Sequence, residues 1–216
     1  MSRFSILAAV LLAACGGTSV QGEIDGETVG LDDAFFVQES GFYDDGDDLV
    51  HIVAGGAGGD LCQRYVELEE LYEDLEDGDD SDDIVAWWAD NLPEDFWQVD
   101  IYLRLDDMGD PDEELEGADW DEGLREDGEA NGSFTHFLQP LDDDFWDGDV
   151  RIDDYDEYYE SYLSDGGDVQ VTGFSEDERI SGRFQTDVVD WQGDSEGEVE
   201  VSFSATRCVD IEKYYF

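Results

Sequence analysis

Basic side chains are almost missing from this chain, and their scarcity limits what it can bind. The 216 residues include 9 Lys+Arg against 62 Asp+Glu, which gives a formal net charge of −53 at pH 7, and Lys213 is the single lysine. Nucleic-acid binding depends on Lys and Arg that meet phosphate groups, and anionic lipid surfaces attract basic segments, not acidic ones. We therefore expect no nucleic-acid partner and no membrane contact other than through an anchor.

Long apolar runs and proline-rich linkers are also absent. The longest mostly apolar segment, residues 4–14, has eleven residues, whereas a membrane-spanning helix needs roughly 20. The prolines are scattered, at Pro93, Pro111 and Pro140. With no linker to divide it, the chain is expected to form a single domain over residues 23–216.

Recognisable catalytic chemistry is scarce. The sequence contains no H-E-x-x-H, P-loop or G-x-G-x-x-G pattern and has only two histidines, His51 and His136. Both lie in segments that alternate like strands, and we favour two unrelated strand residues over a shared zinc site. With 62 acids, some carboxylate pair always has the spacing of a glycoside hydrolase, so a hydrolase is the least favoured function. We expect no enzyme activity, no cofactor and no metal site.

The abundant acids favour a folded domain with an acidic surface over a disordered chain. High net charge with low hydrophobicity predicts disorder, but 40% of the residues are hydrophobic and 13% are aromatic. Such a surface repels itself unless salt screens it, so we expect adaptation to high salt. Calcium sites are the alternative at 43–48, 76–83 and 142–149; none matches the EF-hand spacing, which favours solvated acidic loops.

The apolar segment near the start of the chain ends at a cysteine. Its length is typical of a signal-peptide core, and it closes with Leu12-Ala13-Ala14-Cys15. This tetrapeptide closely resembles the lipobox of bacterial lipoproteins. The resemblance implies that residues 1–14 are removed, that Cys15 carries lipid, and that residues 15–22 form a short tether. An ordinary secretory leader, cut near Ala14, is the alternative.

The same resemblance predicts a location. Lipid on Cys15 would hold the protein at a membrane in the cell envelope without a spanning helix. In the lipoproteins that this segment resembles, aspartate after the lipidated cysteine often signals inner-membrane retention, so Gly16 favours the outer membrane. The expected partners are the membrane, through the lipid, and other envelope proteins or cations; the oligomeric state is left open.

Two cysteines remain once Cys15 is assigned to lipid. In a chain that leaves the cytoplasm, Cys62 and Cys208 are expected to form a disulfide. Two buried free thiols are the alternative. Cys62 falls on the apolar side of a segment with helical spacing, so this disulfide would tie a helix to the last strand.

Apolar spacing predicts one amphipathic helix and many strands. The helix covers about residues 61–76, with apolar side chains three and four residues apart. Strand-like alternation occurs in the following segments: 32–40, 47–56, 96–105, 132–139, 169–174, 180–184 and 198–204, with a tight turn at Asp25-Gly26 and an ambiguous helix or turn at 82–96. The expected fold is mainly β, an antiparallel β-sandwich or open barrel of about eight strands with the helix packed on it. The overall plan loosely resembles small β-rich exported lipoproteins.

Aromatic side chains supply the candidate ligand-binding residues. Trp87, Trp88, Trp97 and Trp146 lie beside acids, and aromatic faces next to carboxylates suit carbohydrate or cationic ligands. The alternative is that they fill the core, as would the tyrosines at 155–162 if these form a helix. We therefore expect a lipoprotein of structural or interaction type; a binding module for carbohydrate, peptide or a divalent cation is the alternative function.

Overall fold

The computed structural model describes residues 18–39, 42, 47–56, 58–76, 82–93, 95–105, 114–119, 129–139, 141, 145, 158–175 and 179–215. Three of the predictions concern residues outside these ranges. They are the lipidation of Cys15, the ligand contact of Trp146, and most of the three acidic stretches that were considered for calcium.

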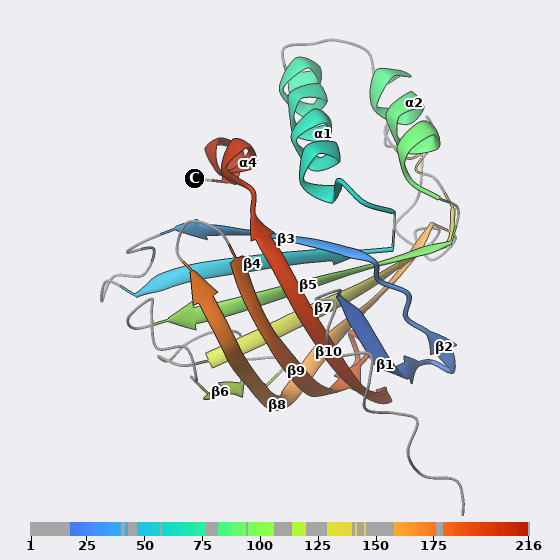
Figure 1. Cartoon of the computed structure of the whole chain (residues 1–216). Helices are drawn as coiled ribbons and strands as arrows, with labels where there is room; N and C mark the ends of the chain where they lie inside the picture. The colour runs from blue at the N-terminus through green and yellow to red at the C-terminus, as the bar shows by residue number, and fades with distance from the viewer. Residues whose placement is uncertain are drawn as a thin grey trace, which may run out of the picture.

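Ten strands and three helices make up the described chain (Figure 1). The elements in order are β1 (Ser19–Ile24), β2 (Glu27–Thr28), β3 (Asp33–Glu39), β4 (Asp48–Gly55), α1 (Leu61–Glu76), α2 (Asp82–Asn91), β5 (Phe96–Leu105), β6 (Glu114–Gly117), β7 (Glu129–Phe137), β8 (Tyr159–Ser175), β9 (Arg179–Val189), β10 (Ser195–Arg207) and α4 (Val209–Tyr215). The predicted mainly β class is confirmed, and so is the helix at 61–76.

The strands pair as a ring. Each neighbouring pair is hydrogen-bonded in the series β10, β3, β4, β5, β7, β8 and β9, and β9 pairs again with β10. The contact of β3 with β10 is parallel and short, with Thr206 opposite Phe35 and Arg207 opposite Phe36. Strand β1 pairs with the earlier part of β10. The sheet is therefore a curled, partly open barrel.

Side chains of alternating strand residues fill the barrel. In β5, Val99, Ile101 and Leu103 are fully buried in the largest hydrophobic cluster, as the two-residue period of a strand predicts. The meander expected at the C-terminal end is confirmed, because Phe184 of β9 lies opposite Val169 of β8 and Val201 of β10. The barrel interior is thus a packed core.

The helices lie on one outer side of the sheet, with α1 and α4 packed on β3 and β4 (Figure 1). Residues of α1 and α4, among them Leu61 and Ile211, share a buried cluster with Phe35 and Val53 of these strands. A disulfide joins Cys62 of α1 to Cys208, which follows β10 directly, with their Cα atoms 5.7 Å apart. The expected pairing is present, and it fixes α1 to the end of β10.

Two local expectations had different outcomes. Asp25 and Gly26 have φ angles of 48° and 78° and join β1 to β2 as the expected tight hairpin. The helix considered for the tyrosines at 155–162 is wrong for Tyr159 and Tyr162, which lie in β8, and Tyr155 lies outside the described residues. Tyr158 and Tyr162 accordingly pack in different clusters.

Candidate functional site

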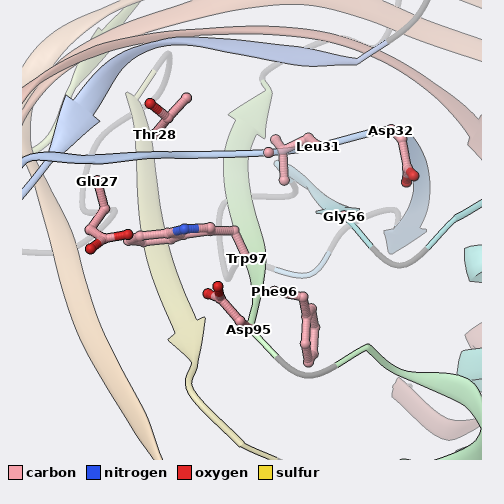
Figure 2. Close-up of a pocket in the computed structure, with 9 residues that line it drawn as sticks. Glu27, Thr28, Leu31, Asp32, Gly56, Asp95, Phe96 and Trp97 are labelled. Carbon is pink, nitrogen blue, oxygen red and sulfur yellow. The ribbon is translucent and has the colours of Figure 1, made fainter.

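An open pocket lies at the end of the barrel where β5 begins. Its volume is about 360 Å³, and the segment that leads from β2 to β3 passes over it (Figure 2). We call it the mouth pocket and define it by its lining: Glu27, Thr28, Gly30, Leu31, Asp32, Gly56, Asp95, Phe96 and Trp97. Three of these residues are acidic and none is basic, so the pocket carries negative charge.

Trp97 and Phe96 are the aromatic residues of the lining, and Trp97 also belongs to the barrel core. The side chain of Trp97 points into the barrel, near the start of β5, and is only 4% exposed. The indole stacks on the ring of His136 in the neighbouring strand β7, with centroids 4.3 Å apart and an interplanar angle of 7°. Figure 2 shows the carboxylates of Glu27 and Asp95 next to the Trp97 ring. Aromatic and acidic groups therefore meet in one small space.

His136 has one satisfied nitrogen and one without a partner. Nε2 lies 2.6 Å from Oδ1 of Asp95, and because a carboxylate only accepts hydrogen bonds, we assign the proton to Nε2. Nδ1 is buried and has no hydrogen-bond partner among the described residues; the nearest acid oxygen, Oε2 of Glu160, is 3.9 Å away. This leaves a buried polar atom turned toward Glu160.

The backbone at Asp95 is strained. Its φ angle of 62° lies in the left-handed region, which residues other than glycine rarely adopt, although Asp and Asn tolerate it best. Such conformations persist only where the surroundings hold them and tend to cluster at functional sites. The bond to His136 supplies one such restraint, and it aims the Asp95 carboxylate at the mouth pocket.

Further acids continue from the pocket along the barrel end. Tyr162 donates a hydrogen bond to Oε2 of Glu160 over 2.9 Å. Burial, together with the carboxylates of Glu160 and Asp25, raises the pKa of Tyr162. We call the following residues the acidic rim: Asp25, Asp95, Glu160, Asp190, Asp194 and Glu196.

The rim acids repel one another. The pKa of Glu196 is raised, first by its reduced hydration and then by neighbouring carboxylates, which are those of Asp25, Asp190, Asp194 and Glu160. Basic side chains pair elsewhere in the described structure: Arg104 with Asp47, Arg183 with Glu200, Arg207 with Glu212 and Lys213 with Glu70. The rim is therefore a region of negative charge that a cationic group would stabilise.

The second histidine belongs to a different environment. His51 lies 2.8 Å from Oδ1 of Asp100, and Gln98 donates to the other oxygen of the same carboxylate. Tyr65 of α1 donates to Gln98, so this buried network joins α1 to the outer face of β4 and β5. The two histidines do not share a site, and no group of three or more metal-ligating side chains occurs within the ranges described.

The three candidate tryptophans that the structure describes, Trp87, Trp88 and Trp97, do not form the exposed patch that the ligand-binding hypothesis requires. Trp87 and Trp88 are 7% and 5% exposed and pack in a cluster with Leu68 and Phe96, so for these two the core alternative holds. Trp97 is also buried, yet it lines the mouth pocket. The sequence does not reveal its contact with His136, because that contact depends on strand register.

One sequence motif also has to be placed. Residues 193–197 read G-D-S-E-G, which matches the G-x-S-x-G pattern of a nucleophile elbow. That motif needs a strand, a turn and then a helix, but here the turn leads into strand β10, where Ser195 pairs with Val189. The chain therefore lacks the backbone context that would expose Ser195 as a nucleophile.

No helix in the described part of the chain is long and apolar enough to cross a membrane. No family model, no curated protein and no solved structure matches this chain.

Proposed function

We propose that this chain is an exported, lipid-anchored protein that binds a small positively charged ligand at the mouth pocket and catalyses no reaction. The anchor rests on the resemblance of Leu12-Ala13-Ala14-Cys15 to a lipobox. A high-salt setting is part of the same proposal, since 62 acids and 9 basic residues make a surface that needs screening.

The mouth pocket is the observation that carries the binding role. Glu27 and Asp95 place two carboxylates beside the ring of Trp97. Carboxylates form charge-assisted hydrogen bonds with ammonium and guanidinium groups, and aromatic faces attract the same cations. A ligand with such a group would gain both interactions and would reduce the repulsion between neighbouring acids.

The position of His136 favours binding over catalysis. A general base has to reach the proton that it removes. His136 is 4% exposed, and its ring is stacked against Trp97. Its unpartnered Nδ1 faces Glu160 and not the pocket lining.

Titration calorimetry with agmatine, which carries a guanidinium and an ammonium group, tests this function. In about 0.5 M NaCl, where the Debye length is only a few ångströms, we expect saturable binding of agmatine and none of a neutral diol of equal length. Glu27→Gln and Asp95→Asn should each weaken binding roughly tenfold, because each removes a charged hydrogen-bond partner. Asn tolerates the backbone conformation of Asp95, so this variant should fold.

Glu116→Gln is the matched control, since Glu116 lies in β6 outside the pocket lining. It should bind agmatine as the unaltered protein does. Equal weakening by Glu116→Gln would show that only the overall charge acts, and equal binding of the diol would show that the cationic groups of the ligand are not recognised. Either result would reject the pocket as a cation site.

The anchor has its own test. Cys15→Ser should move the protein from membrane fractions to the soluble fraction, and a fatty-acid analogue should label the unaltered chain alone. If the unaltered protein takes up no label, the anchor is rejected and the binding role is unaffected.

A further inference from the structure

Trp191 is the most exposed large apolar side chain in the described structure. It is 73% exposed and lies in the turn between β9 and β10. In protein interfaces, tryptophan is enriched among the residues that contribute most of the binding free energy. An exposed tryptophan on a well-formed turn is therefore a candidate contact for a partner.

The turn holds Trp191 in a fixed position. Oδ1 of Asp190 accepts hydrogen bonds from the backbone N–H groups of Gln192 and Asp194, at 2.8 Å and 2.9 Å. The backbone N–H of Gly193 donates to the carbonyl of Asp190, and Gly193 has a φ angle of 84°, which suits glycine. A turn closed in this way loses little conformational entropy when a partner binds Trp191.

The acidic rim connects this turn to the mouth pocket. Asp190 and Asp194 lie close enough to Glu196 to raise its pKa, as does Glu160. Glu160 in turn faces the buried, unpartnered Nδ1 of His136, whose other nitrogen is bonded to Asp95 of the pocket. A backbone hydrogen bond supplies the geometric link, because the N–H of Asp25 donates to the carbonyl of Glu196 over 2.9 Å, and Glu27, two residues further on, lines the pocket. A row of acids therefore leads from the turn that carries Trp191 to the pocket.

We propose that this surface docks an extended, arginine-bearing segment of another exported protein, with one guanidinium stacked on Trp191 and another at the acidic rim. The inference rests on the proposed function, because the same pocket would receive a side chain of this segment. Charge selects the partner: a second copy of this chain, with a net charge of −53, would be repelled. Arginine fits better than lysine, because its planar group stacks on aromatic rings and pairs with carboxylates through two hydrogen bonds.

Calorimetry with an end-blocked hexapeptide of alternating glycine and arginine tests the proposal. Its control is the same peptide with citrulline, a neutral analogue, in place of arginine. In about 0.5 M NaCl, we expect the arginine peptide alone to bind. Trp191→Ala should weaken its binding about three- to tenfold, as expected for an exposed cation–aromatic contact, and Trp191→Phe should restore part of the loss.

Two further variants test whether peptide binding depends on the acidic rim and on Trp191 in particular, and not on any exposed apolar residue. Asp194→Asn removes a rim charge, so it should weaken peptide binding. It keeps the backbone N–H of residue 194, which donates to Oδ1 of Asp190, so the turn should be preserved. Val209→Ala alters another exposed apolar residue, in α4, and should leave peptide binding unchanged. Equal binding by Trp191→Ala and the unaltered protein, or by the citrulline peptide, would overturn the proposal.

Agmatine distinguishes failure of this inference from failure of the proposed function. If Trp191→Ala binds both agmatine and the arginine peptide normally, the docking surface is rejected and the pocket stands. If neither Asp95→Asn nor Glu27→Gln changes the binding of agmatine or of the peptide, the pocket is rejected, and with it this inference.

Discussion

At the scale of single residues, the clearest structural role belongs to a buried ion pair. Nε of Arg104 lies 2.7 Å from Oδ2 of Asp47, and the two side chains are only 7% and 6% exposed. Arg104 points outward from β5, and Asp47 precedes β4. The pair therefore fixes the end of one strand against its neighbour, at the cost of removing two charges from water.

Removing one partner of this pair should be more harmful than removing both. We expect Asp47→Ala to lower the free energy of unfolding by about 3 to 5 kcal/mol, because it removes a carboxylate that faces a buried guanidinium. The double variant Asp47→Leu with Arg104→Met should lose less. Urea unfolding at constant salt measures both, and a loss below about 1 kcal/mol for the single variant would show that the pair acts like a surface ion pair.

Tyr102 provides a pH-dependent prediction. Burial, with a smaller contribution from Asp100, raises its pKa to about 12, whereas a tyrosine in an unfolded chain titrates near 10. Between these values the unfolded chain has lost a proton that the folded chain keeps. The contribution of Tyr102 to stability is therefore fully present below about pH 10 and is lost as pH rises toward about 12.

The Tyr102→Phe variant isolates this effect. We expect it to lose less stability than the unaltered protein between about pH 9 and about pH 11, as measured by urea unfolding. Identical slopes for the two proteins would contradict the raised pKa of Tyr102.

At the scale of elements, α1 is held by contacts from distant parts of the chain. Oδ2 of Asp33, in β3, accepts a hydrogen bond from the backbone N–H of Leu61 at the start of α1, as an N-cap residue would. Tyr65 bonds to Gln98 of β5. The disulfide from Cys62 adds a covalent link in the first turn of the helix.

The disulfide should make a large contribution to stability. The two cysteines are 146 residues apart, and chain entropy for a loop of that order gives about 4 to 5 kcal/mol as an upper figure. We expect Cys62→Ala with Cys208→Ala to lower the free energy of unfolding by about 2 to 5 kcal/mol. Non-reducing peptide mapping should recover the joined peptides, and free thiols at both positions in the exported protein would contradict this.

Elements with a strong local pattern were predictable from the sequence. The apolar spacing at 61–76 gives α1, alternation at 96–105 gives β5, and Asp25-Gly26 gives the hairpin of β1 and β2. The short elements β6 and α4 were not anticipated, because four and seven residues carry too little periodicity.

The candidate site was predictable only in part. Trp97 was named, but its stacking partner His136 comes from β7, and only the pairing of β5 with β7 brings His136 to Trp97 and Asp95. Ring closure likewise depends on the contact of β10 with β3, two strands far apart in the sequence, which a local pattern does not contain. The sequence around Trp191 does not distinguish it from Trp87, Trp88 and Trp97, and only its exposed fraction in the structure does.

At the scale of the whole molecule, charge dominates. Carboxylates that lie within a Debye length repel one another, and this length is about 30 Å at 0.01 M salt but about 3 Å at 1 M. A domain of this size has a stability of only about 5 to 15 kcal/mol. Repulsion among 62 acids is therefore large enough to decide whether the chain folds.

Thermal unfolding in a sodium chloride series tests this dependence. We expect the melting temperature to rise steeply between about 0.05 M and about 2 M NaCl as screening increases. Calcium at equal ionic strength should add little, since the acidic stretches are expected to be solvated loops. A melting temperature that does not change across the series would contradict high-salt adaptation, and a strong effect of a chelator at about 2 M NaCl would indicate calcium sites instead.

The most direct test of the binding role is an NMR titration that observes the tryptophan indole N–H groups. The six tryptophans give separate signals, and the Trp97→Phe variant identifies the one at the mouth pocket. With agmatine added at constant NaCl, we predict a saturating shift of the Trp97 signal, while the signals of Trp87 and Trp88, buried in another cluster, stay in place. An unchanged Trp97 signal, or an equal drift of all six, would contradict a cation site at the barrel mouth.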